Sequence, residues 1–173
     1  MNKISQKLNL ILRQEKMSLD DHVFVENCLA DEDLLVRSLA VRIVGRFRIE
    51  RLLPKLIDSL STGGEKMSFP DAVATFGKKV IPLLKEKLTQ KTNTTFRKNV
   101  AFVLGKIGTE ESKDILMELV EDKSPKVRRV SILELSYIVD KKKNSILLQQ
   151  LLKREKDETV RFLIEKVISK LGK

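Results

Sequence analysis

A small residue recurs eight positions after the start of each of five helix-like apolar segments along the chain. The starting residue is an arginine in four of the five cases, and the starts recur every 28 to 33 residues. A fixed period of this length is typical of stacked supersecondary units, each of which buries its apolar face against its neighbours. For a protein with this period, we expect function to depend on the surface of the stack and not on a catalytic site. The pairs are Arg37 with Gly45, Phe69 with Gly77, Arg97 with Gly105, Arg128 with Ser136, and Arg161 with Ser169.

Apolar residues within each period follow the spacing of an α-helix. In the segment 31–47, one helical stripe contains Val36, Leu39, Ala40, Ile43, Val44 and Phe47. Because no stretch shows convincing period-two alternation, we predict an all-α protein of about eleven helices, with a helix at 3–15 capping the N-terminal end. The lysines at 141–143 are interpreted as a solvated loop. The other predicted helices are 20–29, 50–60, 80–88, 95–107, 112–120, 125–139, 145–152 and 158–171.

The repeated pattern D-x-x-x-x-V-R-x-x-A-x-x-x-V-G resembles HEAT repeats of the short bacterial and archaeal type that also occurs in phycobilin lyases. Its best copies are 31–45, 94–105, 124–136 and 157–169. The resemblance covers about residues 20–171 and implies a right-handed α-α superhelix, a HEAT-like solenoid with the Val-Arg helices on its concave side. We therefore expect a single domain over 1–173 with helix pairs at 20–47, 49–77, 79–107, 111–139 and 143–171. The second repeat departs most, because Phe69-Pro70 replaces Val-Arg.

The small residue near the end of each Val-Arg helix is interpreted as a packing device that lets a neighbouring backbone approach. An arginine at the start of such a helix can bind carbonyls and acids of the adjoining repeat. The expected structural ladder is Asp31, Arg37, Arg97, Arg128, Asp157 and Arg161.

Little in the sequence supports catalysis. The single histidine, His22, and the single cysteine, Cys28, are too few for a zinc site of the usual spacing. The glycine pair at 63–64 lacks the Lys-Ser/Thr of a phosphate-binding loop. We therefore predict no catalytic residue, cofactor or metal. One cysteine excludes an internal disulfide, and the N-terminus lacks the features of a signal peptide. A cytosolic or nuclear location is therefore expected, of which we favour the cytoplasmic one.

Glu134 breaks the apolar pattern. It occupies the sixth position after a repeat start, where the other repeats have Ile43, Thr75, Val103 and Val167. Two interpretations fit this position. Either the carboxylate is buried with a partner or a raised pKa, or the helix face shifts locally, which the out-of-pattern Ile132 and Leu133 favour.

The side of the Val-Arg helices away from the apolar stripe is enriched in cations. Of the fifteen residues one, five and nine positions after the repeat starts, eight are basic and none is acidic, and the whole chain carries a net charge of +10. Phe162 lies on this side as well. The predicted partner-binding residues are Arg42, Arg46, Lys78, Lys98, Phe102, Lys106, Arg129, Leu133, Tyr137, Lys166 and Lys170.

Two functions fit such a surface. The first, which we favour, is a non-enzymatic scaffold or adaptor that binds an acidic helix or peptide of a protein partner. The second is nucleic-acid binding, in which the cations follow phosphates and the aromatic residues stack on bases. Activity like that of HEAT-like DNA glycosylases or of bilin lyases is remote, because the sequence lacks an identifiable catalytic pocket. The cations could also be merely solvated.

Overall fold

A computed structural model describes residues 2–62, 67–90, 92–138 and 141–171. Within these ranges the regular elements are eleven α-helices and two short 3-10 helices, with no strand, which confirms the all-α prediction. None of the helices described is long and apolar enough to cross a membrane. The chain divides into two compact units that meet in sequence at Glu86 and Lys87, and each is described by itself. The predicted single domain with five repeat boundaries stays a prediction.

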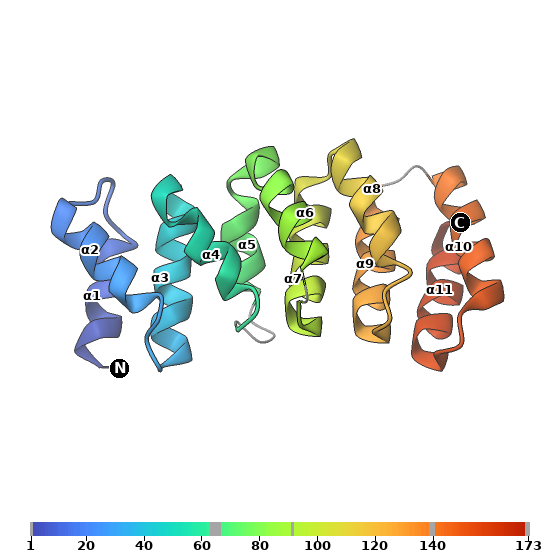
Figure 1. Ribbon diagram of the computed structural model, residues 1–173, viewed down its shortest axis with the longest axis horizontal. Helices are drawn as coiled ribbons and strands as arrows, with labels where there is room; N and C mark the ends of the chain where they lie inside the picture. The colour runs from blue at the N-terminus through green and yellow to red at the C-terminus, as the bar shows by residue number, and fades with distance from the viewer. Residues whose placement is uncertain (1, 63–66, 91, 139–140, 172–173) are drawn as a thin grey trace. The chain divides into compact units, whose positions relative to one another are not determined.

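In the first unit α3 lies between α1 and α5, while α2 packs against α3 and α4 packs against α5 (Figure 1). The fifth helix contains 7 residues, whereas α3 contains 14. The 3-10 helices are Glu50–Leu52 and Gly77–Val80. The α-helices are α1 (Lys3–Ile11), α2 (Leu19–Cys28), α3 (Leu34–Phe47), α4 (Leu53–Ser59), α5 (Ser68–Ala74) and α6 (Ile81–Thr89), of which α6 spans the boundary between the units.

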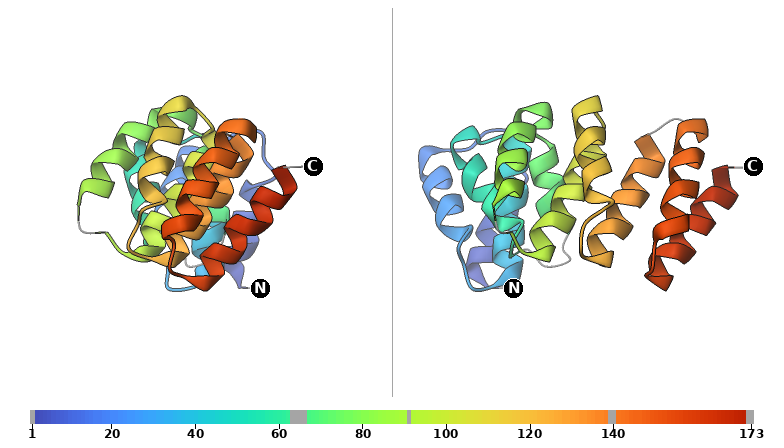
Figure 2. Two further views of the ribbon diagram at one scale, coloured as in Figure 1. Left: turned by 90° about the vertical axis from the view of Figure 1, so that its right-hand side faces the viewer. Right: turned by 45° about the vertical axis from the view of Figure 1, so that its right-hand side comes forward.

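In the second unit α9 lies between α7 and α11, and α8 and α10 pack against these three helices (Figure 2). The helices are α7 (Thr94–Ile107), α8 (Glu110–Leu119), α9 (Pro125–Ile138), α10 (Lys141–Arg154) and α11 (Glu158–Leu171). We call α3, α5, α7, α9 and α11 the inner helices, and α2, α4, α6, α8 and α10 the outer helices. The loop predicted for lysines 141–143 is wrong, because α10 begins at Lys141. Lysine has a high helix propensity and extends this helix by a turn.

Consecutive inner helices approach each other closely at two glycines. A Cβ added to Gly45 would lie 2.7 Å from the Cα of Ala72 on α5, and a Cβ added to Gly105 would lie 2.7 Å from the Cβ of Glu134 on α9. The hydroxyl of Thr75, the residue directly after α5, has two acceptors within hydrogen-bond distance, the Ala72 carbonyl at 2.7 Å and the Gly45 carbonyl at 3.0 Å. Neither helix pair could keep its spacing with a side chain at the glycine.

Gly77 does not share this packing role. It follows the end of α5, has a φ of +62°, and a Cβ added to it would contact nothing within 4 Å. It adopts a left-handed backbone conformation, which costs glycine little because it has no Cβ. The packing interpretation is therefore wrong for this residue, because α5 ends at Ala74 instead of continuing to position 77.

The arginines at the starts of four inner helices bind backbone carbonyls of the segment before their own helix. Each uses its Nη1 atom, and in each case the acceptor lies five or six residues upstream. The bonds run from Arg37 to Asp31 at 2.6 Å, from Arg97 to Thr92 at 2.6 Å, from Arg128 to Asp122 at 2.9 Å, and from Arg161 to Glu155 at 3.0 Å.

Two of these arginines also form ion pairs with an acid in the loop before the next inner helix. Arg97 pairs with Asp122 at 2.6 Å and 3.1 Å, and Arg128 pairs with Glu155 at 2.7 Å and 2.6 Å, both in bidentate geometry. Only 8% of the Asp122 side chain and 7% of the Glu155 side chain are exposed. Polar contacts thus connect Arg97, Asp122, Arg128, Glu155 and Arg161 across the second unit.

The acids of these pairs differ from the acids that the sequence suggested for the ladder. Asp157 caps the first turn of α11 by accepting hydrogen bonds from the backbone of Thr159 and Val160. Asp31 accepts one from the backbone of Asp33. Both acids shape the loop before an inner helix, whereas Asp122 and Glu155 form the ion pairs with the arginine of the preceding inner helix.

Gly45→Ala tests the close approach in the first unit. In an unstrained helix this substitution is favourable by up to about 1 kcal/mol. Here the added methyl group would force α3 away from the α5 backbone, so we expect a loss of about 1–3 kcal/mol in the free energy of unfolding. Urea denaturation measures it, and an unchanged or increased stability would contradict the packing role.

Glu155→Gln tests the buried ion pair. Hydrogen bonds from Arg128 lower the pKa of Glu155, so the charged carboxylate stabilises the fold above the ordinary carboxyl pKa. This contribution is lost as the pH falls through the lowered folded value. We expect the variant to lose about 2–4 kcal/mol at pH 7, with the gap to wild type closing in acid. Glu118→Gln, at an exposed position on α8, is the control, and an equal effect of both substitutions would refute the role of the pair.

Candidate protein-binding surface

A groove of about 510 Å³ lies across the three inner helices of the second unit. Its apolar lining consists of Phe102 from α7, Val130 and Leu133 from α9, and Phe162 and Leu163 from α11. Its polar lining consists of Arg129, Glu158, Thr159 and Lys166. We call these nine residues the aromatic groove. It brings together four of the predicted partner-binding residues, namely Phe102, Arg129, Leu133 and Lys166.

Helix periodicity explains why these side chains converge. Arg129 and Leu133 are four residues apart on α9, and Phe162 and Lys166 are four residues apart on α11, so each pair shares one helix face. The repeat register places Phe102 at the position of α7 that corresponds to Leu133 on α9. Three helices therefore contribute equivalent faces to one concavity.

Phe162 is the most exposed apolar residue of the groove, with 66% of its surface accessible. Phe102 and Leu133 are half-buried, and Val130 is 7% exposed. The groove thus has a supported floor and one aromatic ring that projects into solvent. Exposed apolar surface beside a concavity is typical of a binding site.

The margin of the groove carries two cations and one acid. Arg129 and Lys166 are exposed, and so is Glu158 at the first position of α11. The sequence predicted a face without acids, but Glu158 lies at the margin of the groove. The prediction missed it because position 158 is not among the fifteen positions compared. Its carboxylate is favourably placed at a helix N-terminus. The margin still has more positive than negative charge.

Sequence reasoning missed four of the lining residues, Val130, Glu158, Thr159 and Leu163. The signal for them was spacing along the helix. Glu158 lies one turn before Phe162, and Val130 lies one turn before Leu133, so each follows from a residue that the repeat register had already placed.

Four other predicted residues lie on the same inner helices without lining the groove. Tyr137 is 73% exposed near the end of α9. Lys106 and Lys170 are exposed and Lys98 is half-buried, and Lys98 and Lys106 both interact with other groups of the protein. A partner in the groove would reach these four residues only if it extended beyond the apolar centre.

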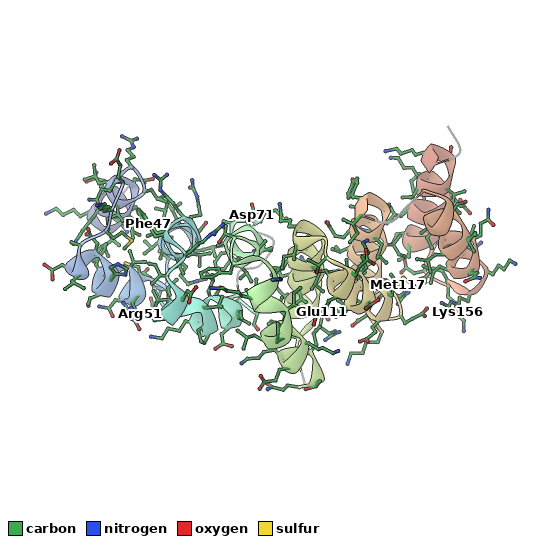
Figure 3. The ribbon with its side chains drawn as sticks, turned by 90° about the horizontal axis from the view of Figure 1, so that it is seen from above. Phe47, Arg51, Asp71, Glu111, Met117 and Lys156 are labelled. Atoms are coloured by element: carbon green, nitrogen blue, oxygen red, sulfur yellow. The ribbon has the colours of Figure 1, made fainter. Side chains whose placement is uncertain are left out.

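The first unit has a more polar groove, of about 580 Å³, between α3 and α5. Arg42 and Arg46 line it, together with Asp71, which lies on the inner-helix side of the unit, opposite Arg51 (Figure 3). Arg46 is held within the unit, because it donates a hydrogen bond of 3.2 Å to the Gln14 carbonyl. Lys78 is exposed on the 3-10 helix Gly77–Val80 and does not line this groove. This groove has the same balance of charged residues as the aromatic groove, but its lining contains no aromatic side chain and one of its two arginines is engaged by Gln14.

Glu134 is half-buried, with its carboxylate lying over Gly105. Burial raises the pKa of Glu134, and the nearby ammonium of Lys106 opposes this effect. The helix face is not shifted, because Val127 and Leu135 are buried at the same offsets as Val36 and Val44. The structure therefore favours the buried carboxylate over the shifted face.

Other reactive groups lie outside the grooves. The Cys28 thiol is buried, and burial raises its pKa, as expected of a packed side chain. His22 is half-buried in the first turns of α2. The part of the chain that the structure describes contains no cluster of three side chains able to hold a metal ion.

Comparison with known proteins gives one positive result. A family model described as HEAT repeats matches residues 81–169, a span that begins at α6 and reaches into α11. No curated protein matches the chain. The matched span includes every residue of the aromatic groove.

Glu134→Gln tests the buried carboxylate. Because the pKa of Glu134 is raised in the folded state, its charged form opposes folding. Stability is then lost as the pH rises from the ordinary carboxyl pKa through the raised folded value. We expect the variant to have a higher Tm than wild type at pH 7 and an equal Tm at about pH 4, measured by circular dichroism. A lower Tm at pH 7, with no change for Glu118→Gln, would show that the charge is instead stabilising.

Proposed function

The chain belongs to the HEAT-repeat family, and from this membership we propose that it is a non-enzymatic scaffold whose inner helices bind an acidic segment of a protein partner. HEAT repeats generally act as protein-interaction scaffolds. Stacked helices of this kind offer long, continuous surfaces for such binding. The observation that supports an acidic partner is the aromatic groove, with Arg129 and Lys166 at its margin.

The contrast between two adjacent arginines supports a binding role for the groove cations. Arg128 is 16% exposed and its donors are used by Glu155 and by the Asp122 carbonyl. Arg129 is exposed and lines the groove. The first arginine holds the fold together, and the second keeps its guanidinium accessible to an incoming carboxylate, which it can bind in bidentate geometry.

The lining of the groove favours a protein partner over a nucleic acid. Five of the nine lining residues are apolar, and the phosphate backbone of a nucleic acid has no apolar group to place against them. Nucleic-acid surfaces depend mainly on cations that follow the phosphate backbone. A protein segment can satisfy both the apolar centre and the cations, since it can alternate apolar and acidic side chains. The net charge of +10 would accelerate its encounter with the surface.

Charge reversal at the groove tests the proposed function. The probe is a fluorescein-labelled peptide of glutamates around one central phenylalanine, and fluorescence anisotropy at low salt reports its affinity. Arg129→Glu combined with Lys166→Glu should weaken binding about tenfold or more, because each change replaces an attraction with a repulsion. The effect should shrink as salt is added.

Lys126→Glu combined with Lys153→Glu is the matched control, because both lysines are exposed and lie outside the groove. An equal loss in the control would mean that only net charge matters, and the site would be refuted. A labelled single-stranded DNA that binds more tightly than the peptide, and is lost on the groove reversal, would assign the surface to nucleic acid instead.

A further inference from the structure

We propose that the aromatic groove recognises one large apolar side chain of the partner, flanked on both sides by carboxylates, so that the ligand is an acidic–apolar–acidic segment. The inference rests on the proposed function and adds the feature of the partner that gives specificity. It is carried by the apolar floor, the projecting Phe162 ring and the positions of the two marginal cations.

The floor is suited to an apolar side chain. A volume of about 510 Å³ is within the range of sites that hold a small ligand, and it leaves room for a large side chain with the backbone that carries it. Phe102 and Leu133 form the floor, and buried Val130 supports it. An aromatic anchor could pack edge-to-face against Phe102 or Phe162, which adds to the gain from burial.

The exposed ring of Phe162 indicates that the groove can accept an apolar side chain from a ligand. Two thirds of its surface is accessible, although the other apolar residues of the groove are half-buried or buried. A bound apolar side chain would cover this ring against the floor and remove apolar surface from water on both molecules. Burying an aromatic side chain typically changes affinity by a factor of ten or more.

The two cations flank this apolar centre from different helices, one helical turn apart. In the repeat register Arg129 and Phe162 occupy equivalent positions of α9 and α11, and Leu133 and Lys166 occupy equivalent positions one helical turn later. In each of these two helical turns, one cation therefore stands beside one apolar residue of the neighbouring helix, and the two cations lie on different helices. A segment with its apolar side chain between Leu133 and Phe162 has a cation on either side, which calls for acids on both flanks.

The walls of the groove are held in place by contacts within the second unit. The Arg128–Glu155 pair ties the start of α9 to the loop before α11. Arg129 directly follows Arg128 in sequence, and Glu158 lies three residues after Glu155. At the other side, α7 packs closely on α9 where Gly105 meets Glu134. A preformed site loses little freedom on binding, which favours recognition of a single anchor.

Two peptides of equal length and charge test the inference, one with a central phenylalanine and one with a central alanine between the glutamates. Wild type should bind the phenylalanine peptide about tenfold more tightly. Phe162→Ala should bind both peptides with the affinity that wild type has for the alanine peptide. Because Phe162 is largely exposed, the variant should keep its Tm, and Phe162→Gln provides a second replacement.

Met117→Ala, at a 40% exposed position on the outer helix α8, is the matched control and should bind like wild type. Equal affinity of wild type for the two peptides would overturn this inference, whereas charge-dependent binding of both would leave the proposed function standing. An equal loss in Phe162→Ala and Met117→Ala would overturn it too. If neither peptide bound at low salt, both proposals would fail.

Discussion

Two buried ion pairs, Arg97 with Asp122 and Arg128 with Glu155, set the arrangement on which the second unit depends. Each joins the start of one inner helix to the loop before the next, and each is bidentate and largely removed from water. Buried charges of this kind tolerate little error in geometry, since separating them leaves an unpaired charge in the protein. The spacing of α7, α9 and α11, and with it the aromatic groove, follows from these contacts.

On the inner helices, some residues hold the fold together while their direct neighbours in sequence line the groove. The side chain of Arg128 is used by the fold, while that of Arg129 lines the groove. Gly105 and Glu134 occupy the contact between α7 and α9, and Leu133 beside Glu134 faces the groove. Because successive residues on a helix point in different directions, one inner helix can pack on its neighbour and present a ligand surface. A binding surface can then be changed with little effect on the packing behind it.

Local signals in the sequence predicted much of this fold. The apolar spacing placed α7, α9 and α11 within about a residue of their observed ends, because each is a full-length helix with a regular stripe. The same pattern failed in the second repeat, where α5 ends at Ala74 and Gly77 serves a turn. Asp122 and Glu155 were not identified as the paired acids, since their partners lie 25 and 27 residues away. The repeat register located part of the groove, but Glu158 and its charge became visible only once α9 and α11 were placed together.

The central claim is that an acidic, apolar-anchored segment binds across the inner helices of the second unit. The most direct measurement is a map of backbone amide chemical shifts in the full chain as the phenylalanine-centred acidic peptide is added. The account predicts saturable shifts concentrated on the groove residues of α7, α9 and α11, with little change on the outer helices α8 and α10. Shifts spread over exposed lysines throughout the chain, or centred on α8 and α10, would contradict it.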